Sequence, residues 1–160
     1  MAVGRFLAMI GMLVWRRDDG RYLLLRRASN RDYAPGQWET GSGRLEQGEG
    51  FIDALRRESR EELGREVRLE CILGTTHFYR GDAVPENEMV GLSFGCSIPD
   101  AAGLRVSDEH SEYRWVTADD AKALFPADHW LPALIARAEA VRSLMPEELC
   151  RLHWEGDLEF

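Results

Sequence analysis

The chain has 160 residues, of which 44% are hydrophobic and 30% charged, and its net charge is −8. This composition is typical of a globular domain and excludes disorder and collagen. The longest apolar run, residues 6–15, is half of the roughly twenty residues that span a bilayer. We therefore expect one cytoplasmic domain over residues 1–160, without a membrane helix or a secretory signal. The acidic balance argues against nonspecific nucleic-acid binding.

The first half of the chain carries an apolar hairpin and a polar loop. Residues 6–15 and 22–27 are apolar runs joined by Asp-Asp-Gly, which predicts two strands, the first buried on both faces. Turn-forming residues predict a loop over 28–36, and a short strand is expected over 37–40. The Gly-Ser-Gly at 41–43 predicts a tight, open backbone segment.

A helix is predicted over residues 51–63, because apolar positions recur there with a period of 3.6. Its buried stripe consists of Phe51, Ile52, Leu55, Ser59 and Leu63. Gly64 stands where a helix C-cap is expected.

The second half alternates strands with connections and ends in helices. Alternating apolar residues predict strands over 67–79 and 90–98, and a short strand is expected over 112–116 after the polar stretch 107–111. A helix is expected to start at Thr117, a second to be capped by Asp128, and one or two further turns to follow Pro146. The three cysteines have neither disulfide nor zinc spacing, so we expect reduced core thiols at Cys71, Cys96 and Cys150. The mixture of strands and helices predicts an α/β sandwich.

Three carboxylates crowd one face of the predicted helix. Glu58 and Glu62 are four residues apart, and Glu61 flanks the same face. Like charges at this spacing repel, and a hard divalent cation such as Mg²⁺ removes the conflict. The alternative is a solvated face neutralised by the neighbouring arginines Arg56, Arg57, Arg60 and Arg65.

The spacing of these residues decides between the two interpretations. The segment 43–65 resembles the Nudix box, Gly-x5-Glu-x7-Arg-Glu-U-x-Glu-Glu-x-Gly-U, in which U is usually bulky and apolar. All seven fixed positions match: Gly43, Glu49, Arg57, Glu58, Glu61, Glu62 and Gly64. Chance agreement at one site is about 10⁻⁸, taking roughly one in fifteen per residue.

The segment departs from the family pattern at three places. Ser59 and Arg65 occupy the U positions, and Gly41-Ser42 stands where many members have Pro-Gly. We expect the Ser59 hydroxyl to bond back to the helix backbone and Arg65 to point outward. These departures affect local packing rather than the pattern of carboxylates.

The resemblance implies an α/β/α sandwich with a mixed sheet, in which the box forms a loop–helix–loop. It also implies hydrolysis of a diphosphate linked to another moiety, with Mg²⁺ as cofactor and Mn²⁺ as a substitute. By the same resemblance Glu58, Glu61 and Glu62 are metal ligands, and the carbonyl of Ser42 is a further candidate. The remaining fixed positions have structural roles in the resemblance. Arg57 and Glu49 form a pair that fixes the loop against the helix, and Gly43 and Gly64 allow a sharp turn of the backbone at each end of the box.

The general base is left open between the box and a later loop. Glu58 is the first choice, and Glu109 and Glu112 are the alternatives because they precede Trp115, where family members often carry a Glu or His. The alternative for this loop is a solvated acidic turn.

Substrate contacts are expected before the box. Arg26 and Arg27 point to opposite faces of a strand, so that one of them can bind a phosphate, and the other candidates are Arg31 and Tyr33 in the following loop. Tyr33 or Trp38 can stack on a base, although for Trp38 the favoured interpretation is a core or interface aromatic.

The expected substrate is a small nucleotide-like molecule, with nucleoside triphosphates as the leading class. Nucleoside diphosphate sugars, dinucleoside polyphosphates and dihydroneopterin triphosphate stay open, as does a nucleotide-binding module without hydrolysis. The sequence also leaves open a homodimer.

Overall fold

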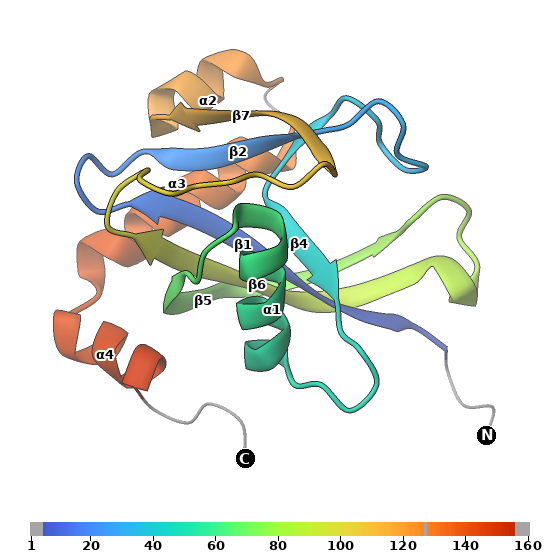
Figure 1. Cartoon of the computed structure of the whole chain (residues 1–160), viewed down its shortest axis with the longest axis horizontal. Helices are drawn as coiled ribbons and strands as arrows, with labels where there is room; N and C mark the ends of the chain where they lie inside the picture. Colours follow the sequence, from blue (N-terminus) through green and yellow to red (C-terminus); the bar gives the residue numbers. More distant parts are fainter. Residues whose placement is uncertain (1–4, 127, 156–160) are drawn as a thin grey trace.

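The computed structural model describes residues 5–126 and 128–155, which form one mixed sheet with helices on both faces (Figure 1). The strands are β1 Leu7–Arg16, β2 Tyr22–Arg27, β3 Trp38–Glu39, β4 Gly41–Arg44, β5 Arg68–Tyr79, β6 Glu88–Ile98 and β7 His110–Val116. The helices are α1 Phe51–Leu63, α2 Ala118–Leu124, α3 Trp130–Leu144 and α4 Glu147–Glu155, with a 3₁₀ turn at Pro85–Asn87. None of the helices in the described part of the chain could cross a membrane.

Strand β1 lies at the centre of the sheet. It runs parallel to β6 from the Leu7–Met89 pair to the Arg16–Ile98 pair, and β5 pairs antiparallel with β6. On its other side β1 meets β2 at the Trp15–Tyr22 pair, whereas its residues 9–12 pair with β4. The two strands of the hairpin therefore diverge, and β3 and β4 fill the gap between them.

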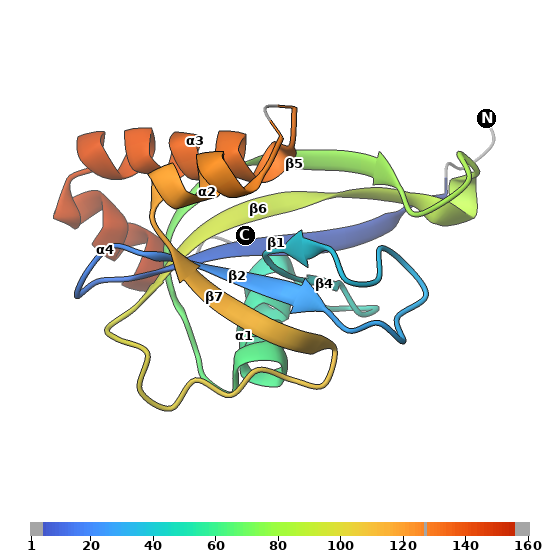
Figure 2. The ribbon, with the colours of Figure 1, turned by 90° about the horizontal axis from the view of Figure 1, so that it is seen from above.

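Both faces of β1 are buried, as the sequence predicts. Ile10 and Met12 pack in a core beneath α1, whereas Leu13 and Trp15 pack in a second core beneath α2 and α3. Figure 2 shows α1 on one side of the sheet and α2 and α3 on the other. The architecture is the expected α/β/α sandwich.

The predicted helix over 51–63 is confirmed at both ends. Gly64 adopts a left-handed conformation with φ 67°, which a glycine tolerates without a Cβ penalty, and its N–H bonds to the Arg60 carbonyl. Ser59 is fully buried, and its hydroxyl donates to the Arg56 carbonyl at 3.0 Å. Arg65 does not simply point outward, because it donates to two backbone carbonyls of the 100–102 turn.

Three local expectations are corrected. The 41–43 segment is not an open loop but most of strand β4, because it pairs with β1. His129 rather than Asp128 caps α3, and its Nδ1 accepts the Leu131 N–H at 3.3 Å. Strand β7 begins at His110, two residues before the expected start of the 112–116 strand.

Other expectations hold. Thr117 caps α2 in a reciprocal capping box, and Cys71 and Cys96 are buried free thiols. Cys150 is also free but only half-buried, because it lies on α4 against the edge of the sheet.

Candidate active site

Helix α1 places its three glutamates in different environments. Glu62 is buried, with 6% of its surface exposed, although it carries a carboxylate. The side chain of Glu58 is largely buried, whereas that of Glu61 reaches solvent. The three glutamates of this helix therefore differ in solvent exposure, and Glu62 is the most deeply buried.

Burial makes ionisation of the two inner glutamates unfavourable. It raises the pKa of Glu62 well above its usual range, and the nearby Glu58 carboxylate raises it further. The backbone N–H of Ser42 opposes this effect by donating to Glu62 Oε2 at 3.0 Å. Burial also raises the pKa of Glu58, against a hydrogen bond from Arg57. Two repelling carboxylates in a partly dry site are the condition that a bound cation relieves.

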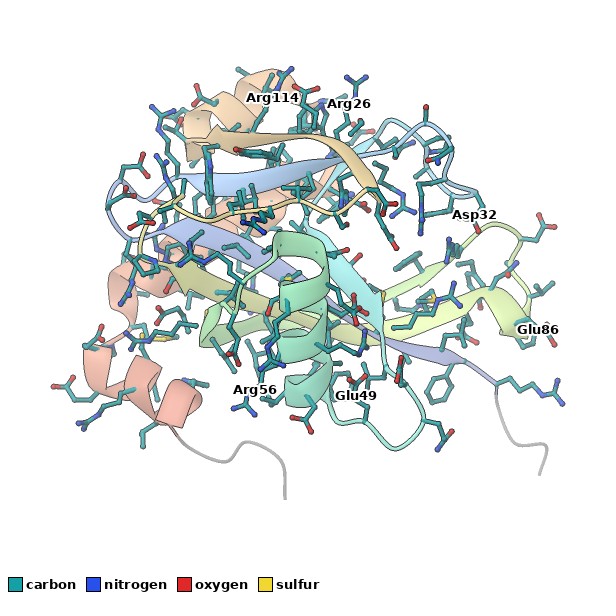
Figure 3. The ribbon with its side chains drawn as sticks, in the orientation of Figure 1. Arg26, Asp32, Glu49, Arg56, Glu86 and Arg114 are labelled. Atoms are coloured by element: carbon teal, nitrogen blue, oxygen red, sulfur yellow. The ribbon has the colours of Figure 1, made fainter. Side chains whose placement is uncertain are left out.

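Arg57 ties α1 to the loop before it. Its Nε and Nη2 form a bidentate pair with Glu49 at 2.9 and 2.8 Å, and its Nη1 lies 2.7 Å from Glu58 Oε1. Nη2 also donates to the Arg44 carbonyl at 2.9 Å. The pairing with Arg57 lowers the pKa of Glu49, and the hydrogen bonds to Glu49 and Glu58 raise the pKa of Arg57. Figure 3 shows Glu49 beside α1, where its loop enters the helix.

Glycines on β4 let α1 approach the sheet. A Cβ on Gly43 would overlap the Glu58 carboxylate, and one on Gly41 would collide with Glu62 and with Met12 of β1. Neither glycine has positive φ. The need for glycine here is close approach rather than backbone freedom.

The backbone of Ser42 faces the helix. Ser42 lies opposite Gly11 in the antiparallel β1–β4 pair, and Glu62 accepts its N–H. In such a pair the N–H and C=O of one residue point to the same side. The Ser42 carbonyl therefore also points away from β1, toward the side on which Glu62 lies.

The oxygen atoms around α1 are of the chemical type that a hard cation binds. Carboxylate and carbonyl oxygens are the ligands that Mg²⁺ takes in proteins, and Glu58, Glu61, Glu62 and Ser42 supply them. Protein donors occupy the two inner carboxylates, Arg57 on Glu58 and Ser42 on Glu62. Within residues 5–126 and 128–155, no three acidic, histidine or cysteine side chains are gathered closely enough to hold an ion in this arrangement.

Glu109 and Glu112, the two alternative candidates for the general base, have different neighbours. The charge of Glu109 raises the pKa of both Glu58 and Glu62, and Arg31 Nη2 binds Glu109 at 2.8 Å. Glu112 instead binds Arg26 and Arg114, which together lower its pKa, Arg114 contributing most. Of the two, Glu109 is the one that the structure brings to the α1 glutamates.

A groove of about 680 Å³ lies mainly on the α3 face of the sheet and extends to β4, Arg27 and Glu39. Its walls come from the sheet, the 28–36 loop and the start of α3. Residues from all three lining segments include Gly11, Arg27, Tyr33, Trp38, Glu39, Ser42, Phe78, Trp130 and Arg137. Ser42 belongs to this lining and also binds Glu62, so the groove and the glutamates meet at β4.

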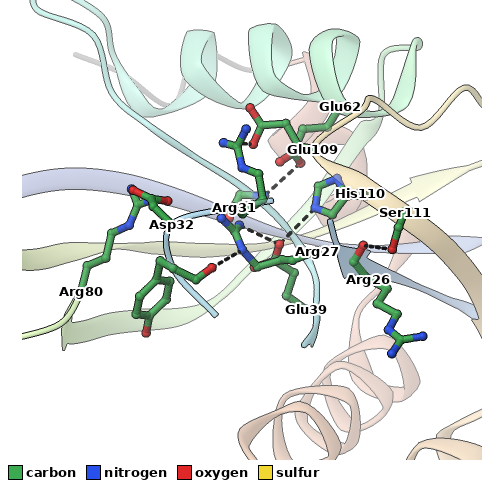
Figure 4. Close-up of polar contacts among 12 residues, drawn as sticks. Arg26, Arg27, Arg31, Asp32, Glu39, Glu62, Arg80, Glu109, His110 and Ser111 are labelled. Atoms are coloured by element: carbon green, nitrogen blue, oxygen red, sulfur yellow. Dashed lines mark hydrogen bonds and ion pairs between the residues drawn. The ribbon is translucent and has the colours of Figure 1, made fainter. Parts of the chain in front are cut away.

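Of the four predicted substrate-binding residues, two line the groove and two are bound to acidic side chains. Arg27 and Tyr33 line the groove. Arg31 binds Glu109, and Arg26 binds Glu112 and the Gly36 carbonyl. Figures 3 and 4 show Arg26 directed away from α1 and its glutamates.

Sequence reasoning missed Glu39 and His110. Glu39 Oε1 accepts from both Arg27 Nη1 at 2.9 Å and His110 Nε2 at 3.0 Å (Figure 4). The three residues lie on β3, β2 and β7, so their association depends on the sheet order. The one sequence signal was the position of His110 in the acidic stretch before Trp115.

Comparison with known proteins places the chain in a family. A family model described as the NUDIX domain matches residues 7–138. The chain belongs to the Nudix hydrolase family. Nudix relatives include the nucleoside triphosphatase NudI of Escherichia coli, 35% identical over 111 residues that cover 65% of this chain and 78% of that protein.

Solved Nudix structures share the fold. The MutT protein of Methanosarcina mazei superimposes with a TM-score of 0.71 at 22% identity, covering 89% of this chain and 99% of that one. An Ap4A hydrolase of Caenorhabditis elegans gives a TM-score of 0.64 at 21% identity, covering 87% and 99%. At this identity the likeness confirms the Nudix fold class.

Proposed function

We propose that this Nudix hydrolase is a Mg²⁺-dependent pyrophosphohydrolase that cleaves a nucleoside triphosphate by attack of water. The observation that carries the proposal is the complete set of box glutamates on α1, held against β4 where the groove ends. A binding module without hydrolysis would not need three carboxylates crowded at a cost in electrostatic repulsion.

The residues divide the work as follows. Glu58, Glu61 and Glu62, with the carbonyl of Ser42, hold the cation; Arg57 and Glu49 fix the loop against α1. Bound there, Mg²⁺ would neutralise phosphate oxygens and lower the pKa of a coordinated water.

Proton removal from the attacking water needs a carboxylate near that water. Glu58 and Glu109 both face this region, whereas Glu112 is turned to Arg26 and Arg114. A positioned carboxylate base typically contributes about 10²–10⁴-fold to the rate. We assign the base to Glu58, with Glu109 as the alternative that substitution separates from it.

The groove favours a nucleoside. It joins aromatic side chains, Tyr33, Phe78 and Trp38, to the cation of Arg27, and such rings stack on bases. NudI, the relative at 35% identity, is named as a nucleoside triphosphatase. Other relatives in fold include a dihydroneopterin triphosphate pyrophosphohydrolase, so that compound, dinucleoside polyphosphates and nucleoside diphosphate sugars belong in the test.

The test is a phosphate-release screen over these four classes with Mg²⁺, with Mn²⁺ and with EDTA, in which added pyrophosphatase or phosphatase converts the released pyrophosphate or phosphate ester into inorganic phosphate. We expect metal-dependent turnover of nucleoside triphosphates and a loss of at least about a hundredfold in Glu62→Gln. Glu70→Gln is the matched control, because Glu70 is also a buried carboxylate but binds Ser97 of β6 outside the groove. Nucleotide binding without product across the panel would contradict the proposal and favour a binding module.

A further inference from the structure

Three charged or polar side chains meet where the groove ends. Arg27 of β2, Glu39 of β3 and His110 of β7 are joined through one atom, Glu39 Oε1. The side chains of His110, Arg27 and Glu39 are 1%, 11% and 18% exposed. A hydrogen-bonded ion pair with so little exposure is held in one geometry, unlike a surface pair.

The contacts of His110 fix its role. Its Nε2 must carry a proton because the partner atom is a carboxylate oxygen. Its Nδ1 is buried, and no described residue offers it a partner. The ring therefore acts on its surroundings through a single bond, the one to Glu39.

Arg27 is held on one side and left open on the other. Its Nε donates to the Tyr33 carbonyl at 2.8 Å and its Nη1 to Glu39. No residue in the described part of the chain accepts from Nη2, and Arg27 lines the groove. A guanidinium that lines a groove with two nitrogens anchored and the third without a protein partner is prepared for an anionic oxygen.

The cluster also lies beside the glutamates of α1. Glu39 and Arg27 line the groove together with Ser42, which binds Glu62. Figure 4 shows the side chains of Glu39 and His110 between the sheet and α1, next to those of Glu62 and Glu109. An anion passing from the groove to the glutamates meets Arg27 at this junction.

We propose that Glu39 and His110 are positioning residues for Arg27, which they hold toward a phosphate of the substrate. His110 orients Glu39, and Glu39 in turn orients the guanidinium. This inference rests on the proposed function, because it requires a polyphosphate that spans the groove and the α1 glutamates. Neither positioning residue is expected to touch the reacting atoms.

The kinetic test uses the full chain and the best nucleoside triphosphate from the screen. His110→Leu removes the donor and should raise KM roughly tenfold with kcat within about twofold, the scale of one charge-assisted hydrogen bond. His110→Gln, which keeps a donor near Nε2, should restore KM. Arg27→Met should raise KM at least as far, and adding His110→Leu to it should change nothing more. Glu70→Gln controls for the general effect of disturbing a buried polar group.

A second measurement does not depend on turnover. The ¹⁵N NMR signal of the Arg27 Nε–H reports the order of its side chain in the protein alone. We expect an ordered signal in the wild type and in His110→Gln, and a mobile one in His110→Leu. An ordered Arg27 in His110→Leu, a fall in kcat at constant KM, or full additivity with Arg27→Met would overturn the inference. Absence of any metal-dependent turnover would instead overturn the proposed function, and the NMR result would still decide the positioning role.

Discussion

At the scale of single residues, Glu62 couples stability to pH. Its pKa is raised in the folded chain by burial and by the charge of Glu58. Between the unfolded and folded pKa values the folded chain binds more protons than the unfolded chain, so the free energy of unfolding falls as the pH rises through this interval. The metal-free protein is therefore destabilised at neutral pH by the residue that we assign to metal binding.

Glu62→Gln should raise the melting temperature of the metal-free protein at pH 7. The amide keeps an oxygen for the Ser42 N–H without a buried charge, and each kcal/mol recovered corresponds to about 2–4 °C. The gain should vanish below the unfolded pKa, where wild-type Glu62 is protonated. Melting curves of both proteins at pH 4 and pH 7 in EDTA measure this difference in melting temperature. A variant less stable than the wild type at pH 7 would show that ionised Glu62 stabilises the fold.

Gly43→Ala should abolish most activity while the protein stays folded. The new methyl group would occupy the position of the Glu58 carboxylate and displace it. Gly74→Ala is the control, because a Cβ on that β5 glycine meets nothing within 4 Å and its φ is not positive. Initial rates with circular dichroism of both variants decide the question. Near-normal rates in Gly43→Ala would mean that Glu58 need not stay where it lies.

At the scale of elements, local pattern predicts those that need no distant partner. Helix α1 is predicted to the residue, because its apolar stripe and the Gly64 cap are both encoded within the segment. Strand β4 is missed for the opposite reason. Its glycines predict a tight, open backbone segment, but in the structure they pair with β1 and leave room for the glutamates of α1.

The candidate site is predicted in the same uneven way. The box glutamates, Arg57 and Glu49 follow from a contiguous motif, and the structure brings these residues together. Glu39 and His110 are seventy-one positions apart and meet because β3 and β7 both pair with β2. No spacing rule connects them, so the sequence alone could not have identified the pair.

The 28–36 loop is joined to the end of β5 across the groove. Arg80 binds Asp32 at 2.6 Å and lies over the ring of Tyr33, which stacks on Phe78 with 6.4 Å between ring centroids. Arg80→Met should loosen this wall and raise KM about two- to fivefold at constant kcat, as expected for one exposed ion pair. The charge-swapped pair Asp32→Arg/Arg80→Asp should recover part of the loss in steady-state kinetics. An unchanged KM in Arg80→Met would show that the contact does not shape the groove.

At the scale of the whole molecule, most of the groove lies on the α3 face of the sheet, whereas the glutamates lie on the α1 face. Leu13 and Gly11 face the groove, whereas Ile10 and Met12 face α1, and the two sides meet at Ser42. A packed sheet deforms little, so the distance from the nucleoside to the attacked phosphorus is set by the sheet. Nucleoside di-, tri- and tetraphosphates should be cut at the same bond counted from the nucleoside. Hydrolysis in H₂¹⁸O with mass spectrometry of both products checks this. A cut that moves with the far end of the phosphate chain would contradict it.

The parallel pairing of β1 with β6 constrains the order in which a newly synthesised chain folds. Leu7 pairs with Met89 and Arg16 with Ile98, so β1 leaves the ribosome long before its longest partner exists. Helix α1 emerges in between, with an apolar stripe and no finished sheet to cover it. Non-local pairing of this kind is slow, and an unpaired strand edge is a template for association with other chains. Chains that stop before Ile98 should therefore be prone to aggregate. The glutamates of α1 reach the positions described above only after β6 has been translated.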